Sequence, residues 1–370
     1  MIPVNTPKIY KEMFTLTNQA LHSGWLSGEG PMVKKFENEF SKFIGMRYGA
    51  TTNSGTAALH LAIAALDITK GDEVIVPALT IASCYFAILY TGATVVPVDV
   101  DEDTYTMNPK LIEQAITKHT KAIMPVHLYG HPCDMDPIMR IAKKHHLYVI
   151  EDAAEAHGAE YKGKKVGSFG DISIFSFYAN KIVTCGEGGM ILTNKKSLFD
   201  KIDHLKNLAH SKKRRFVHDT IGYNYKMTNI QAALGLASFS HIKESIYKKQ
   251  TMAKIYIRGL QKISGIILPK EQPWAHSVYW MYAIRIQKKK FGLTRNAVMK
   301  KLAEHGVQTR TFFFSPKTAY KKMHLFQTKS YPVAEALEKE GLYIPSGVGT
   351  TKKEMQIVVK TLQSLHADCI

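Results

Sequence analysis

Short runs of β-branched and apolar residues alternate along this chain with segments that have the apolar spacing of helices. Such alternation is typical of a mainly parallel sheet with helices on both faces. Residues 31–45 repeat large apolar side chains at three- and four-residue spacing after a proline, which predicts an amphipathic helix. We therefore predict an α/β fold. The strand-like runs are EVIVP (73–77), TVVPVDV (94–100), KAIMPVHL (121–128), LYVIED (147–152), DISIFSF (171–177) and GMILTN (189–194).

A long helical stretch over about residues 228–259 is predicted to lead out of this sheet. Beyond it, SVYWMYAIRI (277–286) and GVQTRTFFF (306–314) have the composition of strands. We predict a large domain over residues 1–245 and a smaller α/β domain over residues 246–370.

The chain carries 49 Lys and Arg residues against 31 Asp and Glu residues, a net charge of +18. This charge suits nucleic acid, a membrane surface or a phosphorylated metabolite, and it does not choose among them. The basic runs SKKRRF (211–216) and QKKKF (287–291) belong to no zinc-finger, RNA-recognition or basic-zipper pattern. We interpret them as solvated surface and expect no nucleic-acid partner. Salt-dependent binding to duplex DNA would test that alternative.

No charged residue occurs between Val74 and Val98, a length that could cross a bilayer. Pro77, Gly92 and Pro97 divide this segment into strand, helix and strand, so we expect part of the core and no membrane span. The first residues lack signal-peptide features, and the cysteines show no CxxC pair or metal-ligand spacing with histidine. We therefore expect a reducing cytoplasm and no metal site. The cysteines are residues 84, 133, 185 and 369.

Three segments carry candidate chemistry. In YGATTNSGTAALHLAIAAL (48–66) a strand end, a polar turn and a helix follow one another. The helix start offers free N–H groups to a phosphate, with the hydroxyls of Ser54 and Thr56 as further donors. Taken alone, this segment is better explained as an ordinary helix N-cap.

The second segment, LYVIEDAAEAHG (147–158), places Asp152 at the carboxyl end of a strand, where open α/β sheets bind ligands. The third, FSFYANKIVTCGEGG (175–189), places Lys181 between an apolar run and a glycine-rich turn. Asp152 could also cap a helix, and Lys181 could be a surface lysine. A phosphate turn, an acid and a lysine in this order are what pyridoxal phosphate requires, because a desolvated amine attacks the cofactor aldehyde and an acid holds the pyridinium proton.

With these residues in place, nearly the whole chain resembles the DegT family of sugar-nucleotide aminotransferases. The resemblance implies the aspartate-aminotransferase-like (type I) fold of pyridoxal-phosphate enzymes, with a large mainly parallel-sheet domain and a small C-terminal α/β domain. The motifs that carry it are SGWLSGEGP (23–31), NSGTAALHLA (53–62), VHLYGHPCDM (126–135), IEDAAEAHGAEYKGKKVGSFGDISIFSFYANK (150–181), GEGGM (186–190) and IGYNYKMTNIQAA (221–233).

The resemblance implies a role for each matching residue. Lys181 is the lysine that forms a Schiff base with the cofactor and acts as acid and base, Asp152 pairs with the pyridinium nitrogen, and Glu155 lies by the phenolic oxygen. Asn224 reaches the phosphate from the neighbouring subunit, which implies a homodimer with shared active sites. The other residues that hold the phosphate are Ser54, Gly55, Thr56 and Ser176.

Within the family, several motifs are most similar to those of members that aminate C4 of GDP-4-keto-6-deoxymannose with L-glutamate. This likeness implies those two substrates. Arg310 and Trp25, in the SGWLSGEG loop, are candidates for binding the nucleotide sugar. Family members that dehydrate the sugar carry histidine in place of Lys181, so the lysine favours amino transfer.

The chain departs from the family at ALTIASCYFAILYTG (78–92), where Ile81 takes the place of the aromatic ring that usually stacks on the cofactor. Tyr85 or Phe86 would replace it only if the helix were shifted. Two alternatives stay open: an aminotransferase for a UDP- or dTDP-linked keto sugar, and a non-catalytic regulator that binds pyridoxal phosphate.

Overall fold

The computed structural model describes residues 1–211, 214 and 216–367 of the chain. Parts of the basic run 211–216, namely residues 212, 213 and 215, lie outside the described residues, as does Cys369. Within the described residues, no helix is long and apolar enough to span a membrane.

The main sheet has seven strands within the described part of the chain, in the order β1-β9-β8-β5-β4-β2-β3. All neighbours pair in parallel except β9, which runs antiparallel to both β1 and β8. The six strand-like runs of the sequence each contain a strand of this sheet. Its strands are β1 (Tyr48–Thr52), β2 (Glu73–Pro77), β3 (Thr94–Val98), β4 (Thr120–Ile123), β5 (Tyr148–Asp152), β8 (Ile172–Ser176) and β9 (Gly189–Thr193).

Helices cover both faces of the sheet, and β8 shows why. Phe175 and Phe177 pack edge-on against Phe40 of the predicted amphipathic helix, α2, whereas Ile174 and Ser176 point to the opposite face. That opposite face of β8 meets the start of α3, since a Cβ on Gly55 would lie 2.9 Å from the Cβ of Ser176. Helices α1, α2 and α7 pack together, and α3 packs with α4 and α6. The helices named so far are α1 (Lys11–His22), α2 (Pro31–Ile44), α3 (Gly55–Ala65), α4 (Ala82–Tyr90), α6 (Lys196–Lys206) and α7 (Asn229–Ser240); α5 spans Met135–Lys144.

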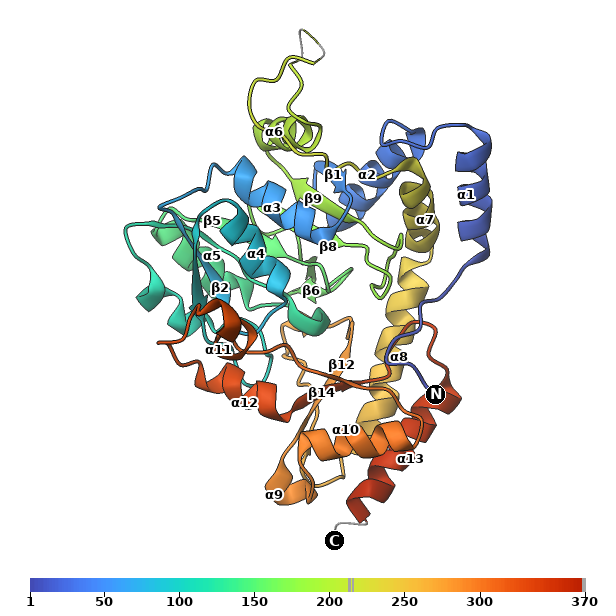
Figure 1. The fold of residues 1–370 in the computed structure, drawn as a ribbon. Coiled ribbons are helices and arrows are strands. Elements are labelled where there is room, and N and C mark those ends of the chain that lie inside the picture. The colour runs from blue at the N-terminus through green and yellow to red at the C-terminus, as the bar shows by residue number, and fades with distance from the viewer. Residues whose placement is uncertain (212–213, 215, 368–370) are drawn as a thin grey trace.

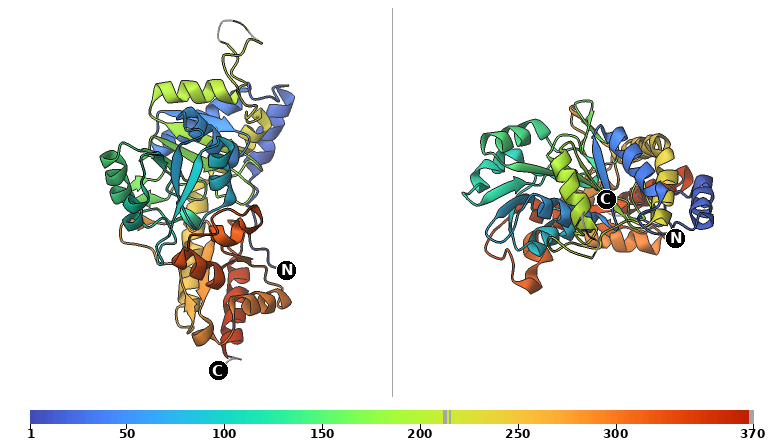
Figure 2. Two further views of the ribbon diagram at one scale, coloured as in Figure 1. Left: turned by 60° about the vertical axis from the view of Figure 1, so that its left-hand side comes forward. Right: turned by 90° about the horizontal axis from the view of Figure 1, so that it is seen from above.

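A smaller unit follows, in which β10, β12, β14 and β13 form an antiparallel sheet. Figures 1 and 2 show it at one end of the molecule, joined to the main sheet by α8. A third, small sheet has the order β11-β6-β7. These elements are β6 (Glu160–Tyr161), β7 (Lys164–Lys165), α8 (Ile242–Leu260), β10 (Ile266–Ile267), β11 (Ala275–His276), β12 (Tyr282–Ile286), α9 (Lys288–Phe291), α10 (Arg295–Glu304), β13 (Arg310–Thr311), α11 (Pro316–Ala319), α12 (Pro332–Glu340), β14 (Gly341–Ile344) and α13 (Lys352–Ala367).

Two elements differ from the sequence-based expectation. The long helix expected over residues 228–259 is two helices, α7 and α8, because the backbone leaves the helical conformation at His241. There the imidazole stacks on the ring of Tyr10 with centroids 3.9 Å apart. The strands within 277–286 and 306–314 are also shorter than their apolar runs, because the flanking residues line a pocket or pack on neighbouring elements.

Most of the buried apolar side chains of the described residues form two cores. The larger core surrounds the seven-stranded sheet, and the smaller one lies between the antiparallel sheet, α8, α10 and α13. The predicted domain boundary falls inside α8, where Ile246 packs on the larger core and Met252 belongs to the smaller. The N-terminal residues also reach the smaller unit, since Ile2 bridges to Val307. The boundary at residues 245 and 246 stays a prediction.

Candidate active site

A pocket of about 400 Å³ lies at the carboxyl ends of β1, β2, β4, β5 and β8, beside the start of α3. This is the edge where parallel sheets bind ligands. The structure brings together here all the predicted site residues except Trp25 and Asn224, which do not line this pocket within the described chain. The predicted residues in the pocket are Ser54, Gly55, Thr56, Asp152, Glu155, Ser176, Lys181 and Arg310.

The start of α3 forms one wall of the pocket. Ser54 is the N-cap of this helix, and its hydroxyl accepts a hydrogen bond from Ala57 N–H at 3.1 Å. The Thr56 hydroxyl is 2.8 Å from that of Ser83. The N-cap explanation of this segment is therefore correct, and it leaves the first N–H groups of α3 and the positive end of its dipole at the pocket.

Asp152 ends β5 with its side chain buried, at 2% exposure. The Cys84 thiol donates to its Oδ2 at 3.0 Å, and Ala154 N–H donates to Oδ1 at 3.0 Å. No cationic group of the described residues forms an ion pair with it. Burial raises the pKa of Asp152, and the Cys84 and Ala154 donors oppose that rise.

Lys181 lies in the loop after β8, with its side chain only 9% exposed. Its Nζ is 3.7 Å from Glu155 Oε1 and 3.8 Å from the centre of the Trp280 ring. Burial lowers the pKa of Lys181, which Glu155 and Asp152 partly offset. Burial likewise raises the pKa of Glu155 to about 7, although Lys181 and the N–H of Tyr129 stabilise its charge. Lys181 is thus an amine that loses its proton readily, as an attacking amine must.

These features fit pyridoxal phosphate. The contact of Gly55 with Ser176 leaves no room for a side chain at the helix start, so a phosphate can approach the backbone N–H groups. Asp152 is a buried acid without a cation, and the pyridinium nitrogen would supply one. Asn180 Oδ1, buried at the pocket, has no hydrogen-bond partner among the described residues.

Trp25 and Asn224 lie on the surface of the described chain. Trp25 is 53% exposed, and its carbonyl accepts a hydrogen bond from Asn229 Nδ2. Asn224 is exposed, and its carbonyl accepts a bond from the Asn53 side chain next to the α3 turn. Their predicted roles across a subunit interface stay predictions.

Ile81 lines the pocket, so the structure has an aliphatic side chain where an aromatic ring was expected. Neither alternative replaces it. Tyr85 is buried and stacks on Tyr320, with ring centroids 4.9 Å apart, and Phe86 packs edge-on against the same ring. Neither ring lines the pocket, so Ile81 occupies this position.

Sequence reasoning missed the outer wall of the pocket, which is aromatic. Trp280, Phe313 and Tyr343 line it from the smaller unit. Their segments could be recognised as strand-like runs, but nothing in their local pattern connects them with Lys181.

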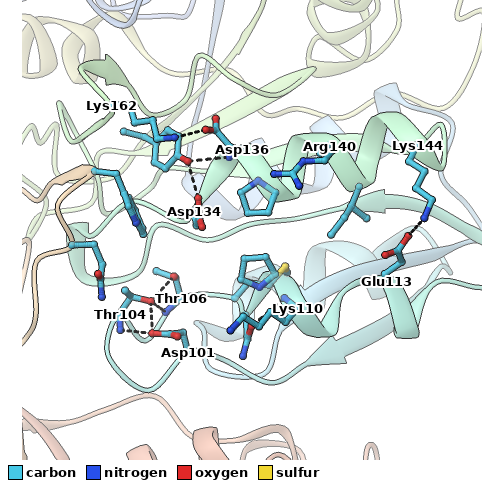
Figure 3. Close-up of a pocket in the computed structure, with 18 residues that line it drawn as sticks. Asp101, Thr104, Thr106, Lys110, Glu113, Asp134, Asp136, Arg140, Lys144 and Lys162 are labelled. Carbon is cyan, nitrogen blue, oxygen red and sulfur yellow. Dashed lines mark hydrogen bonds and ion pairs between the residues drawn. The ribbon is translucent and has the colours of Figure 1, made fainter.

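A larger groove of about 790 Å³ lies elsewhere, between the loop after β3, α5 and the residues around Trp274 (Figure 3). Four of its eight charged side chains form ion pairs with one another, Lys162 with Asp136 and Lys144 with Glu113. It contains neither Lys181 nor Asp152, so size alone does not mark the active site. No group of three or more His, Cys, Asp or Glu side chains in the described ranges could hold a metal ion.

The chain is similar to known proteins over nearly its whole length. Residues 7–363 match the model of the DegT/DnrJ/EryC1/StrS aminotransferase family. The chain is 42% identical to GDP-perosamine synthase of Escherichia coli O157:H7, covering 99% of both chains. It is 39% identical to GDP-perosamine synthase of Caulobacter vibrioides, covering 98% of both chains.

A solved structure is also similar, that of the sugar aminotransferase Spr1654 of Streptococcus pneumoniae in its PLP form. The TM-score is 0.93 at 28% identity, with 100% of this chain and 99% of that chain covered. The expected fold class and the expected cofactor are thereby confirmed.

Proposed function

The chain belongs to the DegT/DnrJ/EryC1/StrS aminotransferase family and depends on pyridoxal phosphate, and from this premise we propose that it moves the amino group of L-glutamate to C4 of GDP-4-keto-6-deoxymannose, forming GDP-perosamine. The observation that carries the chemistry is the meeting of Lys181, Asp152 and the α3 start in one pocket. The choice of acceptor is supported by the full-length relatives that bear the name GDP-perosamine synthase.

When bound, pyridoxal phosphate supplies an electron sink that stabilises the charge left when a proton leaves the amino-bearing carbon. Ser54, Gly55, Thr56 and Ser176 would hold its phosphate, and Asp152 would hold the proton on its ring nitrogen. Lys181 Nζ would anchor the cofactor and would accept and return the transferred proton, because burial lowers the pKa of its amine. Glu155, whose pKa is about 7, holds a proton next to that amine.

We place the nucleotide sugar at the outer wall, where the exposed guanidinium of Arg310 is free to meet the diphosphate. Asn224 of a second subunit would complete the phosphate site, so we propose a homodimer. Its exposure beside Asn53 leaves it available to a partner.

The test supplies purified protein with pyridoxal phosphate, L-glutamate and GDP-4-keto-6-deoxymannose, and measures GDP-perosamine and 2-oxoglutarate by mass spectrometry. We expect both products from the wild type and neither from Lys181→Ala. Faster turnover of UDP- or dTDP-linked 4-keto sugars would instead assign the sister activity. Cofactor binding without any 2-oxoglutarate from glutamate would favour the non-catalytic regulator.

A further inference from the structure

Lys249, in the middle of α8, is only 1% exposed and has no carboxylate partner in the described part of the chain. Its Nζ donates to the carbonyl of Trp280 at 2.7 Å and to the carbonyl of Ser346. Burial without a counter-charge lowers the pKa of Lys249 to about 7. Such a group is costly to keep in a core, so its two carbonyl contacts call for an explanation.

The first of those contacts leads directly to the active site. Trp280 is 4% exposed and precedes β12, in the smaller unit. Its ring face lies 3.8 Å from Lys181 Nζ, and its Nε1–H donates to the carbonyl of Asn180 at 2.9 Å. Trp280 thus holds the Lys181 loop both at the amine and at the preceding peptide group.

The position of this ring matters because of what surrounds the amine. Glu155, Asp152, the Cys84 thiol and His157 are titratable groups that interact with Lys181, while burial disfavours its charge. An indole face attracts an ammonium group, most strongly at a desolvated site. The Trp280 ring therefore favours the protonated form of the Lys181 amine. It does so only while the main chain of Trp280 keeps the ring in place.

We propose that Lys249 is a positioning residue, which holds the indole of Trp280 against the amine of Lys181. By donating to the carbonyls of Trp280 and Ser346 it joins the strands β12 and β14 directly behind that ring. The inference rests on the proposed role of Lys181 in amino transfer. The test measures the pKa of the Lys181 amine and requires no turnover. Failure of the positioning role can therefore be distinguished from failure of the proposed amino transfer.

The experiment replaces tryptophan with mono-, di- and trifluorinated tryptophan in the full-length protein freed of cofactor. Fluorine preserves the shape of the ring and weakens its attraction for a cation. The pKa of Lys181 is read from acetic anhydride labelling across pH, followed by mass spectrometry of the Lys181 peptide. We expect this pKa to fall stepwise, by about one pH unit over the series. The other two tryptophans, Trp25 and Trp274, do not line this pocket.

The same series in Lys249→Met tests the positioning role, with Lys254→Met on the exposed face of α8 as the matched control. We expect Lys249→Met to lose the stepwise dependence on fluorine and Lys254→Met to retain it. The proposal would be overturned if the pKa of Lys181 fell stepwise in folded Lys249→Met by as much as in the wild type. It would also be overturned if the pKa of Lys181 in the wild type did not change with fluorination. If Lys249→Met does not fold, Lys249→Gln replaces it, because the glutamine side chain is one atom shorter and does not span both carbonyls. If the pKa of Lys181 falls in Lys249→Gln by as much as in the wild type, the proposal is likewise overturned.

Discussion

At the scale of single residues, burial sets the chemistry of this site. Lys181, Glu155 and Asp152 are all nearly inaccessible to water. Burial lowers the pKa of Lys181 and raises the pKa of Glu155 and of Asp152, so it favours the neutral form of each side chain. The same three residue types on the surface would carry full charges at neutral pH. Burial thus shifts three ordinary side chains toward their neutral forms, and it brings the pKa of Glu155 to about 7.

Glu155 gives a pH-dependent prediction. Its pKa in the folded protein is about 7, above the ordinary value of 4.5, so between these pH values the folded chain keeps a proton that the unfolded chain releases. Stability should be fullest below about pH 4.5 and should decline as the pH rises to 7, by a difference on the order of 3 kcal/mol. Glu155→Gln should lack this decline.

Urea unfolding of the cofactor-free protein from pH 5 to 8 measures the effect. Glu39→Gln, which changes a half-exposed carboxylate on α2, is the control and should follow the wild type. Parallel curves for Glu155→Gln and the wild type would contradict the raised pKa.

At the scale of elements, the site depends on one helix start and on the two-residue alternation of β8. Ser176 and Ile174 face the pocket because Phe175 and Phe177 are committed to the core on the other side. The strand therefore fixes the distance between the phosphate-facing hydroxyl and α3. Local structure and ligand site are specified by the same few residues.

The caps of α3 and α10 provide a matched pair for testing the phosphate site. Ser54 caps α3 at the pocket, and Thr294 caps α10 in the smaller unit by accepting from Ala297 N–H. Ser54→Ala and Thr294→Ala should each cost about 1 kcal/mol of stability. Only Ser54→Ala should also weaken pyridoxal phosphate binding, by roughly tenfold, because it removes a donor to the phosphate. Melting curves and cofactor titrations measure both; equal cofactor affinity in the two variants would remove Ser54 from the site.

At the scale of the whole molecule, the pocket lies where the larger and the smaller unit meet, and side chains of both units pack into the larger core there. Lys181 and Asp152 come from the larger unit, and Trp280 and Tyr343 come from the smaller. Arg285 of β12 joins the smaller unit to the larger by contacting Glu102 at 2.9 Å, and Glu340 of its own unit contacts the same guanidinium at 2.9 Å. Asn224 lies on the surface, so in the proposed dimer the second subunit would bring a third element to the same pocket.

Complementation between inactive variants tests the shared site. Lys181→Ala lacks the catalytic amine, and Asn224→Asp should repel the phosphate. In a mixed dimer, one of the two sites would combine the intact Lys181 of one chain with the intact Asn224 of the other. Because about half of the dimers are mixed, co-expression should restore about a quarter of wild-type activity. Each variant expressed alone is the control. No recovery in mixed dimers isolated with two different affinity tags would show that each site is built from one chain.

The sequence predicted residues that stand at or just after recognisable strand ends and missed those that no local pattern marks. Asp152 ends one strand, and Ser54 and Lys181 each follow another, so the alternating pattern places all three at one edge of the sheet, although each signal taken alone had an ordinary explanation. Trp280 reaches Lys181 from 99 residues away in the chain, and no local pattern encodes that approach. The break at His241 has a similar origin, since it coincides with stacking on Tyr10, far away in the sequence.

The divided origin of the pocket bears on how such enzymes diversify. One part of the pocket lining, with Lys181 and Asp152, comes from residues 54–187, whereas the outer wall comes from residues 280–343. Mutations in the second segment can therefore reshape acceptor preference while the first keeps its chemistry unaltered. A lineage with this architecture can explore new sugars by drift or recombination in its C-terminal third, without passing through inactive ancestors.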